Sequence, residues 1–258
     1  MEVSSRQYLD TADLTFFGLK HDPFEDPHIP VDVWMGGALP AIENTFFLAL
    51  ERREIVILCG DAGAGKSILT RRFCGIAPSR RKSFRLIAPA SIDRSKITST
   101  ALAVAVVRDL TGKDTSSRSP EERGHILRTT LEEQDRMGAL PVLVIDEGHL
   151  LSNGALLAIK QVWDSHILFR KLAVLIIGQV PLALRLRTDP AIQEVTGRSR
   201  IITLPKLAQD EVKSYLAWRF ARVGEKAEAV FDESAYRALA VKGEYPLWIG
   251  NCAIAAMK

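Results

Sequence analysis

Short apolar runs alternate along this chain with segments whose apolar residues recur every three or four positions. The runs predict five strands, at residues 55–59, 84–88, 141–145, 172–177 and 201–204. A strand that is apolar on both faces is typical of a buried parallel sheet. Helical segments between such strands favour an α/β fold.

The spacing of apolar residues also predicts helices, at about residues 40–53, 92–111, 120–137 and 153–166. Ser119, Pro120 and Glu122 combine a capping box with proline at the first helical position, so a helix is expected to begin there. From residue 207 onward the pattern is only helical. Residues 1–35 are expected to be irregular, because prolines interrupt any regular element.

A glycine-rich motif of the form G-x-x-x-x-G-K-[ST] follows the strand at 55–59. It comprises Gly60, Asp61, Ala62, Gly63, Ala64, Gly65, Lys66 and Ser67, and Ile68 continues into a predicted helix. Glycines let backbone N–H groups converge on phosphate oxygens, and the helix directs its positive dipole end at them. Lys66 can reach the β- and γ-phosphates and the Ser67 hydroxyl can ligate Mg²⁺. The motif predicts binding of a nucleoside triphosphate.

Polar residues follow two of the other apolar strands. Asp146 and Glu147 come directly after the strand at 141–145, and Gln179 follows the strand at 172–177. Asp146 is expected to hold Mg²⁺, and Glu147 to polarise the attacking water, which Gln179 can position. A small-molecule kinase also uses a phosphate loop, but Glu147 suits water activation and therefore ATP hydrolysis.

Composition limits the other function classes. The net charge is only +3, so any contact with nucleic acid must come from local patches. The three cysteines have no C-x-x-C spacing and are expected to be buried and reduced. No apolar run reaches the ~18 residues of a membrane span, and the first residues lack a signal-peptide pattern. We expect a cytoplasmic protein without a membrane partner.

Arg198 and Arg200 precede the last predicted strand. An arginine can stabilise the transition state of phosphoryl transfer, because its planar fork pairs with phosphate oxygens and keeps its charge. If the protein forms rings or filaments, one of the two can reach a neighbouring subunit's γ-phosphate. The alternative is that both are ordinary surface arginines.

Taken together with the segment 16–24, which contains Phe16-Phe17-Gly18-Leu19 and Pro23-Phe24, these motifs resemble AAA+ ATPases. The most similar branch contains the transposition regulators MuB, TnsC and TniB and the secretion ATPase ExeA. The resemblance implies a three-layer P-loop NTPase fold with strand order 5-1-4-3-2, and ATP and Mg²⁺ as ligands. It also implies a nucleotide-binding domain over residues 1–206 and a helical lid over 207–258. The aromatic residues of segment 16–24, Phe17 and Phe24 among them, are expected either to be buried in a core or to fold over the nucleotide base, because a flat purine prefers apolar and aromatic walls.

Two departures from the family pattern affect the expected site. Gln193-Glu194 stands where many relatives have Gln-Arg, so Arg198 and Arg200 remain the candidates for a trans-acting arginine. Pro246-Leu247 stands where the lid often has Pro-Arg. No lid arginine is therefore expected at the γ-phosphate, and hydrolysis is expected to be slow or to depend on a partner.

The leading functional hypothesis is an ATP-dependent regulator of DNA transposition. By resemblance, such a protein assembles on duplex DNA as a ring or helical filament and recruits or activates a DDE (integrase-fold) transposase. Arg94, Lys96 and Lys160 are the expected contacts to DNA phosphates. A secretion or assembly motor without DNA binding and a helicase-loader-like ATPase are the alternatives.

Overall fold

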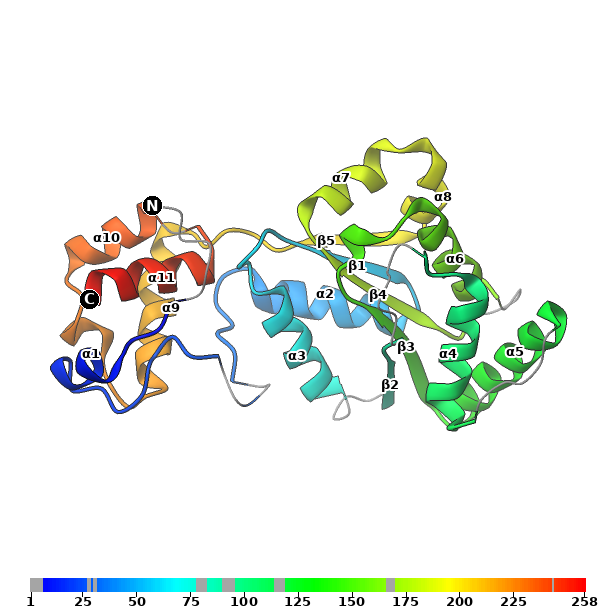
Figure 1. Ribbon diagram of the computed structural model, residues 1–258, viewed down its shortest axis with the longest axis horizontal. Helices are drawn as coiled ribbons and strands as arrows, with labels where there is room; N and C mark the ends of the chain where they lie inside the picture. Colours follow the sequence, from blue (N-terminus) through cyan, green and yellow to red (C-terminus); the bar gives the residue numbers. More distant parts are fainter. Residues whose placement is uncertain are drawn as a thin grey trace. The chain divides into compact units, whose positions relative to one another are not determined.

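The computed structural model describes residues 7–26, 29, 32–77, 83–89, 96–113, 119–165, 170–242 and 244–258 (Figure 1). Contacts divide the chain into two compact units. The sheet unit comprises Ile42–Asp61 and Phe73–Thr203, and the helical unit comprises Met1–Ala41, Ala62–Arg72 and Leu204–Lys258. The domain boundary expected between residues 206 and 207 stays a prediction.

The sheet unit contains five parallel strands. They are β1 (Ile55–Cys59), β2 (Ser83–Ile87), β3 (Ala139–Ile145), β4 (Ala173–Gly178) and β5 (Ser199–Thr203). Their order is β2-β3-β4-β1-β5, which is the predicted order 5-1-4-3-2 in the opposite direction. Strands β1, β3 and β4 are almost wholly buried, as their continuous apolar runs require.

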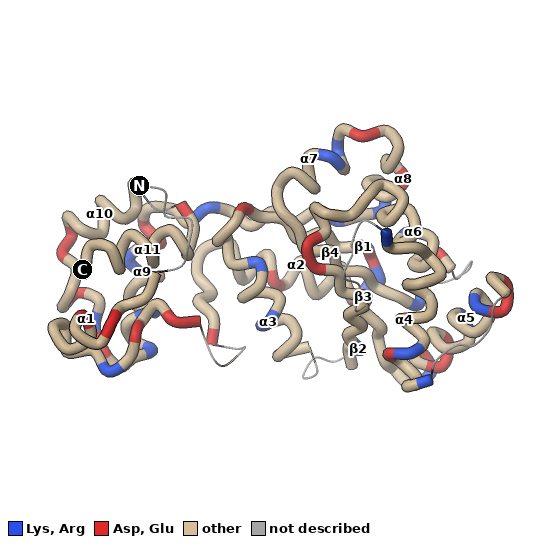
Figure 2. Tube along the Cα trace, viewed as in Figure 1, with Lys and Arg blue, Asp and Glu red and all other residues tan. Residues whose placement is uncertain are grey.

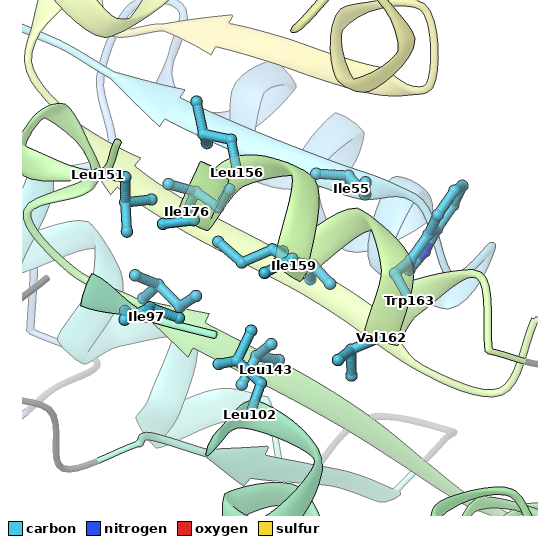
Figure 3. Close-up of a cluster of buried hydrophobic side chains, with 14 of the residues drawn as sticks. Ile55, Ile97, Leu102, Leu143, Leu151, Leu156, Ile159, Val162, Trp163 and Ile176 are labelled. Atoms are coloured by element: carbon cyan, nitrogen blue, oxygen red, sulfur yellow. The ribbon is translucent and has the colours of Figure 1, made fainter. Parts of the chain in front are cut away.

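Helices cover both faces of this sheet. One core lies under α4 (Ser99–Thr111), α5 (Pro120–Arg136), α6 (Asn153–Trp163) and α7 (Val180–Thr188). In Figure 3 the labelled side chains of α6 within this core are Leu156, Ile159, Val162 and Trp163. On the other face, Phe46 and Phe47 of α2 (Leu39–Glu51) meet Phe73 of α3 (Lys66–Ile76) and Phe84 of β2.

Two helix ends in the sheet unit follow from local chemistry. The Ser119 hydroxyl accepts a hydrogen bond from the backbone N–H of Glu122 at 3.3 Å, and Pro120 opens α5 as predicted. Helix α2 ends in a Schellman motif, in which Arg53 donates to Leu50 O and Glu54 donates to Ala49 O. Arg53 has φ 58°, a left-handed conformation that glycine usually supplies.

The helical unit packs α1 (Thr11–Phe16), α9 (Gln209–Ala221), α10 (Glu233–Lys242) and α11 (Pro246–Met257) around one core. Val212, Leu216 and Phe220 are all buried there, which confirms the predicted apolar face of this helix. Helix α1 corrects the expectation that residues 1–35 are irregular. Asp10 caps it by accepting hydrogen bonds from two backbone N–H groups, and the Asp13 carboxylate accepts one from the Asp10 N–H.

Further elements were not predicted from periodicity. They are α7, α8 (Gln193–Thr196) and the short 3₁₀ turns Gly148–Leu150, Pro190–Ile192 and Ala227–Ala229. All but α7 are only three or four residues long, too short to display a helical period. Cys59 is buried as expected, whereas Cys74 is exposed, which corrects the expectation that every cysteine is buried. Among the described residues no helix has the length and apolar character needed to cross a membrane.

Candidate nucleotide-binding site

The phosphate loop has the backbone conformation that its glycines permit. Gly63 has φ 81° and Gly65 has φ 93°, both in the region that side-chain-bearing residues rarely adopt. Helix α3 begins at Lys66, and its first turn closes through a 2.9 Å hydrogen bond from Leu69 N to Gly65 O. The loop therefore opens at the N-terminus of α3, and the N–H groups and positive dipole end of a helix N-terminus favour an anion.

A cavity lies over this loop within the helical unit. It is lined by Asp26, Gly63, Gly65, Lys66, Ser67, Ile68, Arg71, Arg219, Pro246 and Leu247. Three of these described lining residues are cations, and the one carboxylate among them, Asp26, lies 3.5 Å from two nitrogens of Arg71. A cationic cavity at a helix N-terminus is suited to a polyphosphate. We name it the phosphate cavity.

A second, mainly apolar cavity adjoins the first. It is lined by Val33, Trp34, Leu39, Ala64, Gly65, Ile68, Leu69, Leu204, Tyr215, Trp218, Arg219 and Pro246. Trp34 meets the Tyr215 ring edge-on at 5.7 Å, and Tyr215 stacks on Trp218 at 6.2 Å. Flat aromatic and apolar walls suit a nucleobase, so we name it the base cavity.

The aromatic residues of the base cavity are not the ones that the sequence suggested. Phe24 is buried in the core of the helical unit and meets Phe220 edge-on at 6.0 Å. Phe17 packs against the same core and contacts Phe16. Neither is among the described residues that line the base cavity. The missed residues are Trp34, Tyr215 and Trp218, of which the last two share a face of α9 at i and i+3 spacing, the only signal that the sequence offered.

The start of α11 covers the phosphate loop. Leu247 lines the phosphate cavity, and its backbone N–H points to Gly63 O at 3.4 Å. A Cβ at position 63 would lie 2.7 Å from the Leu247 Cβ, so this close approach needs glycine. Leu247 thus occupies the cavity position where the family resemblance implies a lid arginine.

In the sheet unit, Asp146 and Glu147 lie exposed beyond the end of β3. Glu147 has φ 56° and ψ 38°, and its backbone N–H donates to Asp146 Oδ1 at 2.8 Å. Gly148 follows in a space where a Cβ would lie 2.3 Å from Ile176 Cγ2. A left-handed residue other than glycine is strained, and such strain persists where the surroundings fix it, often at functional sites.

The ends of β3 and β4 meet at one edge of the sheet, because the two strands are parallel neighbours. Exposed Gln179 follows β4 and stands at the N-cap of α7 without a side-chain capping bond. β1 ends at the same edge, where Gly60 N donates to Gly178 O at 3.3 Å. Asp146, Glu147 and Gln179 therefore share the edge from which the chain enters the phosphate loop.

A protein-family model described as an AAA domain matches residues 49–186, more than half of the chain. The chain belongs to the AAA domain family. This is an ATPase family, so the AAA+ resemblance is confirmed at this level. The comparison with curated proteins found no match.

Solved structures similar to this AAA domain protein share its fold. Cdc6p from Pyrobaculum aerophilum has 18% identity and a TM-score of 0.58, with 97% of this chain and 64% of that chain covered. The Aeropyrum pernix ORC2 protein, solved as ADPNP-ADP complexes, has 15% identity and a TM-score of 0.56, with 90% and 63% covered. The Aeropyrum pernix ORC1 protein in complex with DNA has 15% identity and a TM-score of 0.53, with 89% and 62% covered. The AAA domain protein spans less than two thirds of each.

Arg198 and Arg200 of the AAA domain protein lie at the opposite edge of the sheet from Asp146. Arg198 precedes β5, and Arg200 pairs in register with Val56 near the start of β1. Five strand residues at about 3.3 Å each separate Arg198 from the carboxyl edge by roughly 16 Å. Neither arginine therefore belongs to the group at the carboxyl edge of its own sheet.

The residues expected to contact DNA have different surroundings. Lys160 Nζ lies 2.9 Å from Glu194 Oε2 and 3.6 Å from Asp164 Oδ2, and the hydrogen bond to Glu194 raises the Lys160 pKa. Lys96 is exposed, and Arg94 lies outside the described residues. Figure 2 shows Lys and Arg interspersed with Asp and Glu in both units. Lys160 is thus engaged by carboxylates in this structure.

Proposed function

We propose that this AAA domain protein is an ATP-dependent, DNA-binding regulator of DNA transposition that hydrolyses ATP. The main observation in support of ATP binding is the pair of adjoining cavities over the phosphate loop. One is cationic and contains Lys66 and Ser67, and the other is apolar and aromatic. This combination matches the charged and flat parts of a nucleoside triphosphate.

The proposed roles follow from side-chain chemistry. Lys66 binds the β- and γ-phosphates, Glu147 accepts a proton from the attacking water, and Gln179 orients that water. The Ser67 hydroxyl and the Asp146 carboxylate are oxygen ligands of the kind that Mg²⁺ prefers. When bound, Mg²⁺ neutralises charge on the phosphates.

Two features support the transposition branch in particular. The segment 16–24 resembles that branch, and Leu247 stands over Gly63 where an arginine is common in other members. In this proposal the protein assembles through ATP, with Arg198 or Arg200 reaching a neighbouring subunit. A transposase then recognises the assembled, ATP-bound form on duplex DNA.

The test traps the ATP-bound state. Glu147→Gln preserves size but removes the basic carboxylate, and loss of a general base lowers the rate by roughly 10²–10⁴-fold. We expect longer-lived oligomers on duplex DNA with ATP than the wild type forms, measured by sedimentation and negative-stain imaging. Lys66→Ala is the control that should not assemble. Equal assembly of Glu147→Gln with and without DNA would favour a DNA-free assembly motor instead.

A second candidate function is suggested by the similar solved structures. The Aeropyrum pernix ORC1 structure contains DNA, and the replication initiator DnaA, with a TM-score of 0.51, was solved with single-stranded DNA. An initiator-like or helicase-loader-like protein is therefore the competing proposal. Affinities for duplex and single-stranded DNA, compared at one stated salt concentration, separate the two. A transposition regulator is expected to prefer duplex DNA, and a loader single strands.

A further inference from the structure

Arg219 is a charged residue buried at the junction of the two cavities. It lies on α9, and only 9% of its surface is exposed. It lines both the phosphate cavity and the base cavity. No sequence motif marks it, because arginine is common on a solvated helix face.

The hydrogen bonds of Arg219 go to uncharged oxygens. Its Nε donates to Tyr215 Oη at 2.9 Å and its Nη1 donates to Glu25 O at 2.8 Å. Among the described residues no carboxylate forms an ion pair with it, and Nη2 has no partner there. The guanidinium also lies 5.3 Å from the ring centroids of Tyr215 and Trp218.

Arg222, the C-cap residue that directly follows α9, provides a contrast. Its Nε donates to Asp32 Oδ2 at 2.9 Å and its Nη1 donates to the same Glu25 O at 3.1 Å. Its charge is therefore neutralised by a carboxylate within the chain. Arg222 is not among the residues that line either cavity.

An unneutralised charge in a buried position is costly, and a bound anion removes that cost. Arginine also retains N–H donors beyond the two used here, because its guanidinium carries five. Tyr215 and the Glu25 carbonyl hold the guanidinium in one orientation, so little side-chain entropy is lost when a ligand binds. These conditions favour direct binding of an anionic group by Arg219.

We propose that Arg219 binds the α-phosphate of the nucleotide. This inference rests on the proposed ATP site. The two cavities share Gly65, Ile68 and Pro246 in addition to Arg219, so these residues mark where the base cavity meets the phosphate cavity. With the base on one side and the terminal phosphates at Lys66 on the other, the charged group at this junction is the α-phosphate.

The experiment measures Kd for ATP and for ADP by calorimetry with wild type and Arg219→Met. Hydrogen bonds to charged groups contribute enough that we expect affinity to fall roughly 10- to 100-fold. The loss should be equal for the two nucleotides, because both carry an α-phosphate. Thermal unfolding without nucleotide should show Arg219→Met no less stable than wild type, whereas its stabilisation by ADP should shrink.

Arg222→Met is the matched control. It removes a charge of the same type three residues further along, at the C-cap of α9, and takes from Asp32 its ion pair with Arg222, so it should lower the thermal midpoint but retain the wild-type Kd. Tyr215→Phe provides a milder variant that keeps the ring and removes the hydroxyl holding Nε. It should weaken the binding of ATP and ADP equally, and by less than Arg219→Met does. It also tests the inference should Arg219→Met fail to fold.

Unchanged affinity in Arg219→Met, or in Tyr215→Phe should Arg219→Met not fold, would overturn the inference. A loss confined to ATP would overturn the assignment to the α-phosphate, because it would place the arginine at the γ-phosphate. If wild type bound neither nucleotide, or bound both without needing Lys66, the proposed ATP site itself would be wrong. Failure of the proposed ATP site is distinguishable from failure of the Arg219 inference, because it is seen with the wild type and Lys66→Ala, before any Arg219 variant is compared.

Discussion

Arg200 donates two hydrogen bonds to the carboxylate of Glu54, from Nε to Oε2 at 2.7 Å and from Nη2 to Oε1 at 3.3 Å. Glu54 raises the Arg200 pKa by this hydrogen bonding. Among the described residues, the Arg198 side chain has only a 3.4 Å contact from Nη1 to Asp164 Oδ2. These two arginines, which the sequence alone does not distinguish, therefore have very different partners.

We expect Arg198 to be the arginine that acts on a neighbouring subunit. Leaving Asp164 would cost Arg198 one long contact, whereas leaving Glu54 would cost Arg200 two hydrogen bonds. Arg198→Ala should lower ATP hydrolysis by roughly 10³-fold or more in the assembled protein, the range for a trans-acting arginine. Arg200→Ala should mainly lower stability.

Subunit mixing checks this prediction. Arg198→Ala retains its phosphate loop and Lys66→Ala retains its arginine, so mixed assemblies should recover activity that neither variant has alone. Recovery with Arg200→Ala but not with Arg198→Ala would reverse the assignment.

A substitution of Gly148 tests how closely the residue after Glu147 packs against Ile176. Gly148→Ala should lower the free energy of unfolding by about 1–3 kcal/mol, because its Cβ would overlap Ile176. Gly124→Ala on α5 is the control, since its Cβ meets no other heavy atom within 4 Å and alanine favours a helix by roughly 0.5–1 kcal/mol. Urea denaturation measures both. Equal effects from the two substitutions would show that packing at Gly148 is looser than described.

Asp135 should give stability a specific acid dependence. Burial tends to raise its pKa, but hydrogen bonds from Lys171 and Arg53 outweigh this and hold the Asp135 pKa below its ordinary value of 3.8. The stabilisation is therefore full above the unfolded-state pKa and is lost as the pH falls through the lower folded-state pKa. Asp135→Asn should destabilise by about 1–2 kcal/mol at pH 7, and the difference should shrink towards pH 3.

Urea midpoints measured between pH 7 and pH 3 report this difference. Glu133→Gln, at an exposed position on the same helix, should leave the midpoint nearly unchanged at every pH. A penalty for Asp135→Asn that stays constant with pH would contradict the assignment of stability to its charged form.

We expect substitutions of Lys96 and Lys160 to have different effects on the salt dependence of DNA binding. Lys96→Ala should weaken duplex binding and make the slope of log K against log salt shallower by about 0.9, the value for one lost phosphate contact. Lys160→Ala should leave the slope unchanged, because Glu194 and Asp164 already engage that ammonium group. Fluorescence anisotropy over a salt series measures both slopes. A shallower slope for Lys160→Ala would show that DNA displaces the carboxylates.

The sequence alone determined the strands and the chemistry attached to their ends. A buried parallel strand must be apolar on both faces, and a phosphate loop must combine glycines with Lys66 and Ser67 in a fixed local order. Ser119 and Pro120 likewise predicted where α5 begins, because N-terminal capping involves only residues within the first turn of the helix. Such features are local in the chain, so their residues could be read without knowing what packs against them.

Only the tertiary structure decided which distant residues meet. Trp34 and Tyr215 line one cavity because α9 packs beside a segment far from it in sequence, and Leu247 covers Gly63 for the same reason. In the sequence Glu194 departs from a family pattern, but its pairing with Lys160 depends on how α6 and α8 pack. Arg219 carried no local signal at all. Its significance comes from burial without a carboxylate partner among the described residues, a property that exists only after the chain has folded.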